Sequence, residues 1–167
     1  MEEWQNYFML TGTGAITLIG LLFVVITLGV ERTEHGDAWL LRTYVTPTLV
    51  HFGGVFLIAL LALSPEGDGL ILPFGMIGIS GVVYGLNIAV KVARNDGLFS
   101  DALLFHGALP VVCYVGIITA VMAAWIGVTS TRQAYFVLRV VSALLLLTGM
   151  RNAWAAAIDV AGRKKLK

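Results

Sequence analysis

Charged residues are scarce in this sequence. Asp, Glu, Lys and Arg make up 13% of its 167 residues, against roughly 25% in soluble domains, whereas 58% of the residues are hydrophobic. A soluble fold of this length could not cover its surface with so few charges, so the composition predicts an integral membrane protein that contacts the lipid bilayer. The net charge of +1 and the lack of a basic face interleaved with aromatic residues give no reason to expect a nucleic-acid partner.

Cysteine is rare, and the common catalytic motifs are missing. The single cysteine, Cys113, lies in an apolar run, cannot form a disulfide within the chain and belongs to no zinc-binding spacing. The sequence contains no P-loop, no HExxH motif and no GxSxG motif. We therefore predict no catalytic residues, no metal site and no enzymatic activity.

Long runs without a charged residue define the organisation of the chain. Four such runs contain between 22 and 30 residues, more than the roughly 20 that cross the hydrocarbon core as a helix. A fifth run is interrupted by Arg139, Arg151 and Asp159, but its arginines lie 12 residues apart, about 18 Å along a helix, and could reach opposite interfaces. We predict an all-α polytopic membrane protein, a single transmembrane domain over residues 1–167. The five expected spans are approximately 5–30, 43–64, 69–91, 104–128 and 134–160.

The positions of the basic residues predict the orientation of the chain. With five spans, nine of the eleven Lys and Arg residues fall on the side of the first loop, the third loop and the C-terminal tail, and two fall on the other side. Because cytoplasmic loops carry the excess of Lys and Arg, we predict an external N-terminus and a cytoplasmic C-terminus. The expected location is the bacterial inner (cytoplasmic) membrane.

A stripe of small and hydroxylated residues runs along the first predicted helix, with spacings of three, four and seven residues that place it on one face. The stripe and its terminal carboxylate comprise Thr13, Thr17, Gly20, Val24, Thr27 and Glu31. Such a face can simply pack against another helix, because small residues let two backbones approach closely. Alternatively it lines a pore in a cyclic oligomer, where threonine rings form a water path, Val24 narrows it and Glu31 favours cations.

The third predicted helix has a glycine face. Gly78, Gly81 and Gly85 lie on one side of the helix, and the last two form a GxxxG motif. In membranes this motif indicates close contact between helices, within one protomer or between protomers. A five-helix unit of this size encloses little space alone, so we also expect a homo-oligomer.

Ionisable and amide side chains inside the spans gather in the predicted cytoplasmic half. The candidates for a proton, ion or gating role are His51, Asn87, His106 and Arg151, with Asp101 and Asn152 close to two of them. Such groups in a membrane usually face a cavity or a partner. The alternatives are a hydrogen-bonded core position for His51 and an interfacial position for His106 and Arg151. Pro47 and Pro110 lie in the same half and would free helical carbonyls there, which favours a vestibule.

Two histidines at similar depth also raise a haem hypothesis. His51 and His106 could supply both imidazoles of a bis-histidine haem if their helices face each other. No spacing motif supports this arrangement, so we expect no cofactor.

The leading functional hypothesis is a small oligomeric channel or transporter for ions or small solutes, with the first helix lining the path. The alternative is a non-catalytic membrane scaffold or subunit that packs against an unknown protein partner through its glycine face. A haem-binding or metal-binding membrane protein is the third hypothesis.

Overall fold

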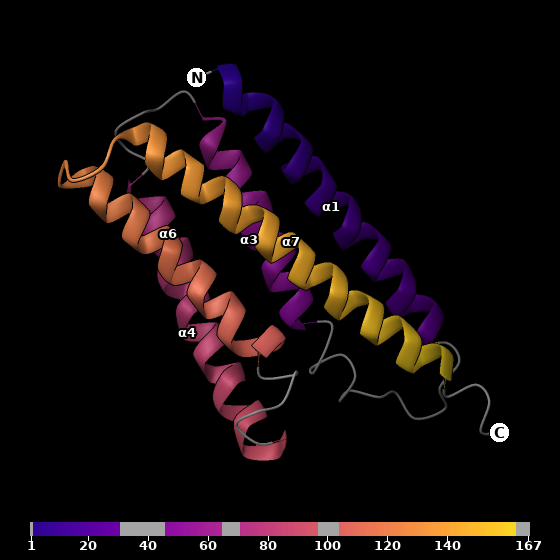
Figure 1. Ribbon diagram of the computed structural model, residues 1–167. Coiled ribbons are helices and arrows are strands. Elements are labelled where there is room, and N and C mark those ends of the chain that lie inside the picture. The colour runs from indigo at the N-terminus through magenta and orange to yellow at the C-terminus, as the bar shows by residue number, and fades with distance from the viewer. Residues whose placement is uncertain (1, 31–45, 65–70, 97–103, 163–167) are drawn as a thin grey trace.

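The computed structural model describes residues 2–30, 46–64, 71–96 and 104–162, and every regular element in them is helical (Figure 1). The elements are α1 (Glu2–Val30), α3 (Thr46–Ala62), α4 (Ile71–Asp96), the π-helical turn η3 (Leu104–Ala108), α6 (Leu109–Trp125) and α7 (Thr131–Gly162).

Four helical stretches are long and apolar enough to cross a membrane, and α3, with 17 residues, is a shorter apolar helix. The four are Trp4–Thr27, Ile71–Arg94, Leu104–Trp125 and Thr131–Ala155. The prediction of an all-α fold is therefore confirmed for the described residues, and the length and composition of these four stretches fit the predicted membrane protein. The last predicted span is one continuous helix, α7, despite the arginines within it.

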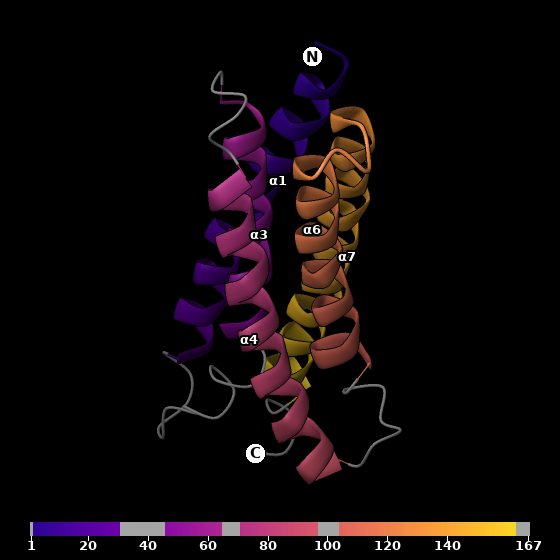
Figure 2. The same ribbon diagram turned by 90° about the vertical axis from the view of Figure 1, so that its left-hand side faces the viewer.

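The helices form three layers. α3 and α7 lie in the middle, α1 packs against both of them on one side, and α6 and α4 lie on the other side (Figures 1 and 2). The shared core contains the fully buried side chains of Phe8, Phe52, Ile58, Tyr114 and Leu145, so each of α1, α3, α6 and α7 contributes to it.

The glycine face of α4 is used inside the protomer. Gly78 lies against Ile118, Gly81 against the ring of Tyr114, and Gly85 against Val111. All three partner side chains belong to α6, so glycine allows the α4 backbone to approach α6 closely. Of the two packing arrangements open for this face, the structure shows the one within the protomer.

The short turn between α6 and α7 follows from local sequence. Gly127 adopts a φ of 73°, a conformation that favours glycine, directly after α6 ends. Ser130 and Gln133 then form a reciprocal cap: the Ser130 N–H donates to Gln133 Oε1 over 3.0 Å, and the Gln133 N–H donates to Ser130 Oγ over 3.3 Å. This capping box starts α7 and makes α6 and α7 an antiparallel pair.

Arg139 is held between α1 and α7 near the N-terminal end of α1. Its guanidinium lies 3.3 Å from the centroid of the Trp4 ring, and the Tyr7 hydroxyl donates to its backbone carbonyl over 2.7 Å. The charge therefore stacks on an aromatic face, an arrangement that lowers the cost of placing arginine in a membrane helix.

Candidate functional site

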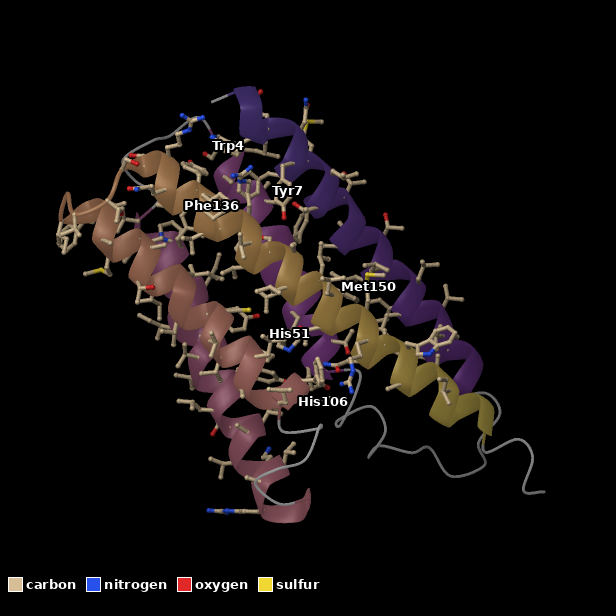
Figure 3. All side chains as sticks on the ribbon, in the orientation of Figure 1. Trp4, Tyr7, His51, His106, Phe136 and Met150 are labelled. Carbon is tan, nitrogen blue, oxygen red and sulfur yellow. The ribbon has the colours of Figure 1, made fainter. Side chains whose placement is uncertain are left out.

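A group of buried polar side chains lies where α3, η3 and α7 meet, at the lower end of the bundle as drawn in Figure 1. His51 from α3 is 1% exposed, His106 from η3 is 8% exposed, and Asn152 from α7 is 0% exposed. Figure 3 shows His51 and His106 in the same lower part of the bundle, and His106 is close enough to act electrostatically on His51. We call His51, His106 and Asn152 the histidine cluster.

The packing of α3 on α7 sets the depth of this cluster. Phe52 of α3 lies directly against Gly149 of α7, where a β-carbon would overlap its ring. The two helices run in opposite directions, so Asn152, one turn beyond Gly149, faces the turn of α3 that precedes Phe52. That turn carries His51 and the buried Thr48.

Pro110 explains how His106 reaches the interior. A proline has no N–H to donate to the carbonyl four residues earlier, which here belongs to His106, and its ring collides with that carbonyl in a regular helix. The chain forms the π turn Leu104–Ala108 at this point and then continues as α6. The turn leaves Leu104 51% exposed while His106 is buried. Single π turns recur at functional sites of membrane and soluble helices.

Pro47 does not interrupt the described helix. It is the second residue of α3, where its missing N–H costs no helical hydrogen bond. Only Pro110 therefore changes the local helix geometry near the cluster.

His51 makes one long side-chain hydrogen bond. Its Nδ1 atom lies 3.4 Å from the hydroxyl of Tyr114, at the long end of the hydrogen-bonding range, and the two ring centroids are 6.1 Å apart. Its other ring nitrogen, Nε2, is buried and has no hydrogen-bond partner. Tyr114 thus orients the imidazole while leaving Nε2 available to another molecule.

Asn152 is the most unusual residue of the cluster. It is completely buried, yet neither its amide nitrogen nor its amide oxygen has a hydrogen-bond partner. An unsatisfied buried amide costs about 1–3 kcal/mol, and such groups usually bind an ordered water or a ligand. By contrast, the buried hydroxyls of Ser142 and Thr148 on the same helix each donate to the carbonyl four residues earlier over 2.7 Å.

Of the four intramembrane candidates, the structure brings two together. His51 and His106 lie in the cluster, whereas Asn87 is exposed on α4. Arg151 is also exposed, with its guanidinium 3.6 Å from the centroid of the Phe105 ring. Arg151 therefore ties η3 to α7 beside the cluster without entering it, and Asp101 lies outside the described residues.

Sequence reasoning gave too little weight to Asn152 and none to Tyr114. A signal for Asn152 was present, because Leu138, Ser142, Leu145 and Gly149 precede it at spacings of three and four residues and are all buried. Continuing that spacing places Asn152 on the buried face of α7 and Arg151 off it. Tyr114 carries no comparable signal, since its role depends on glycines in two other helices.

The stripe on α1 lies on the outside of the protomer. Thr13, Thr17, Gly20, Val24 and Thr27 are all exposed, and Glu31 lies outside the described residues. The inward face of α1 is formed instead by residues such as Phe8, Ala15 and Leu22.

The hydroxyls of this stripe are largely satisfied by their own helix. Thr17 donates to the Thr13 carbonyl over 2.8 Å, and Thr27 donates to the Phe23 carbonyl over 2.9 Å. A hydroxyl bonded in this way can face lipid at little cost, so the stripe does not by itself require a water path.

The cluster offers imidazole and amide groups to a ligand. Two imidazoles from different elements meet one requirement of the haem hypothesis, and His51 Nε2 has the geometry of an available ligand atom. Within the described ranges, however, no three or more His, Cys, Asp or Glu side chains come together in a way that could hold a metal ion.

Comparisons with protein-family models, curated protein sequences and solved structures gave no match to this chain.

Proposed function

We propose that this protein is a small membrane channel or carrier and that protons, alone or together with a small polar solute, pass through the histidine cluster. The observation that carries the proposal is Asn152, a fully buried amide with both polar atoms unpaired, and His51 of the same cluster has an unpaired Nε2 atom. In a membrane helix bundle, such groups are retained where water or a solute occupies the space next to them.

The chemistry of the cluster favours protons and neutral polar solutes over alkali cations. Imidazole exchanges protons near neutral pH more readily than any other ordinary side chain, and an amide both donates and accepts hydrogen bonds. Hard cations are usually bound by several carboxylate or carbonyl oxygens. The described members of the cluster supply one such oxygen, the amide oxygen of Asn152.

The orientation is part of the proposal. The basic residues predict that the end of the bundle holding the cluster faces the cytoplasm of a bacterial inner membrane. The π turn at η3 and the exposed Arg151 beside it would then lie near the cytoplasmic entrance.

The α1 stripe is a weaker candidate for the path, and it could form one only in an oligomer of this chain. It would face water only if α1 helices surrounded a common axis, with Glu31 at one mouth. A scaffold function is the alternative, and the outward face of α1 is the surface that favours it. The glycine face named for that function is covered by α6 and is not free to bind a partner.

The test compares two asparagines in one chain. Purified protein is reconstituted in liposomes that contain a pH-sensitive dye, and proton uptake is driven by a potassium diffusion potential. We expect Asn152→Leu, a change of similar volume, to lower the flux about tenfold or more, as loss of a hydrogen bond in the path would. Asn87→Leu, at an exposed position on α4, is the matched control and should keep the wild-type flux. The proposal would be wrong if liposomes that contain the wild-type protein took up protons no faster than empty liposomes. It would also be wrong if the two substitutions changed the proton flux equally.

A further inference from the structure

A hollow lies on the side of the bundle between α3 and α4. It has a volume of about 420 Å³ and opens to the outside of the protomer. On α3 its lining residues are Val50, Gly53, Gly54 and Leu57, whose spacings of three, four and seven residues place them on one helical face. Seven residues of helix extend over about 10 Å, so the hollow follows α3 for two turns.

The α4 wall has the same pattern. Ile77, Ser80, Gly81 and Tyr84 repeat the spacings found on α3, so the hollow is a groove parallel to both helices. The Ser80 hydroxyl donates to the Ile77 carbonyl over 3.0 Å and is therefore satisfied within its own helix. The groove thus presents a largely apolar surface at mid-height of two helices.

The shape and lining of the groove favour a hydrocarbon chain as its occupant. The groove is open along its side, follows α3 for about 10 Å and is lined largely by apolar groups, so one flexible apolar chain can lie along it. It also runs along the direction in which lipid chains lie in a bilayer that these helices cross.

Tyr114 separates this groove from the histidine cluster. Its ring lies on Gly81 of α4, and its hydroxyl lies 3.0 Å from the position that a β-carbon on Gly54 of α3 would take. The same hydroxyl is 3.4 Å from His51 Nδ1. One face of Tyr114 lines the groove, and its polar end contacts the cluster.

We propose that the α3–α4 groove is a binding site for one acyl chain of a membrane phospholipid, and that Tyr114 couples its occupancy to His51. A chain in the groove supports the Tyr114 ring from the bilayer side and holds its hydroxyl against the imidazole. An empty groove lets the ring move outward and releases His51. The binding site stands on the groove alone, while the coupling rests on the function proposed above.

Gly53 provides a substitution that fills the groove without disturbing the fold. A β-carbon at Gly53 meets nothing within 4 Å, and the same holds for Gly20 on the outer face of α1. Gly53→Leu and Gly20→Leu therefore add the same side chain to open helix surface, inside and outside the groove. Delipidated protein is mixed with a phosphatidylglycerol, and native mass spectrometry counts the lipids that stay bound.

We expect the wild type and Gly20→Leu to retain one phospholipid, and Gly53→Leu to bind it about tenfold more weakly. Equal lipid retention by all three proteins overturns the proposed site. The site is also overturned if Gly53→Leu loses a dimer and not a bound lipid, because the groove would then be a contact between two copies of the chain. Lipid retention is measured without any flux, so a failed transport assay leaves this result intact.

The coupling is tested with Tyr114→Phe, which keeps the ring and removes the hydroxyl that contacts His51. We expect this variant to retain the phospholipid and to show a proton flux that no longer depends on added phosphatidylglycerol, whereas the wild-type flux does. A wild-type flux that is the same with and without the lipid overturns the coupling.

Discussion

The outer face of α1 and the histidine cluster are both polar features of an apolar chain, but their hydrogen bonds are satisfied in different ways. On α1 the hydroxyls of Thr17 and Thr27 bond to carbonyls of their own helix and face outward. In the cluster, Asn152 and the Nε2 atom of His51 are buried without a partner. A polar residue in a membrane helix therefore indicates a function most strongly where its own helix cannot satisfy it.

Glycines show the same contrast between the interior of the bundle and the outer face of α1. Substituting them should have the largest effect on stability. Gly81→Leu would force a side chain into the Tyr114 ring and should lower the stability of the bundle by about 2–3 kcal/mol. Gly20→Leu on α1, where a β-carbon meets nothing within 4 Å, should leave it nearly unchanged. Thermal unfolding in detergent, followed by circular dichroism, measures both. Similar midpoints for the two variants would mean that α4 and α6 do not pack closely through these glycines.

Substitution of Asn152 should have an intermediate effect on stability, and it should stabilise the bundle, whereas most substitutions destabilise a protein. Because its amide is buried and unpaired, Asn152→Leu removes an uncompensated polar group and should raise the stability by about 1 kcal/mol. The same variant is expected to lose flux, which is the exchange of stability for activity that functional sites show. The midpoint of thermal unfolding is the measurement, with Asn87→Leu as control. A fall in the midpoint would mean that Asn152 is a structural residue with a partner of its own.

The threonines of α1 should show the smallest effect. The double variant Thr17→Val and Thr27→Val keeps the shape of the side chains and removes hydroxyls that bond only within α1. We expect the stability to change by less than about 0.5 kcal/mol and the proton flux to stay at the wild-type level. A clear change in flux would instead support the pore interpretation of this face, with α1 helices around the axis of an oligomer.

The site was only partly predictable from the sequence. His51 and His106 could be selected because ionisable residues are rare inside apolar spans, and the same argument selected Asn87 and Arg151. Helical phase separates these pairs: Asn87 and Arg151 lie on exposed faces, while His51 and His106 lie on buried ones. The phase of His106 also depends on the π turn before Pro110, which shifts it relative to a regular helix.

The sequence by itself determined the class of protein. A chain with so few charges and such long apolar runs cannot cover its surface with polar groups, so its helices are suited to contact lipid. The sequence also marked Pro110 as a place where the helix geometry changes, whereas Pro47, marked for the same reason, is the second residue of the regular helix α3. The last span was predicted from residue 134, and α7 begins three residues earlier, at Thr131, after the Ser130 cap. Only the tertiary structure decided which polar residues meet. In a bilayer every face of an apolar helix can contact either lipid or a neighbouring helix. The hydrophobic pattern therefore predicts where the helices are, but not which face of each helix packs against another. Packing placed Gly81 of α4 against Tyr114 and turned the stripe of α1 outward. It also buried Asn152 and His51 with polar atoms that have no hydrogen-bond partner.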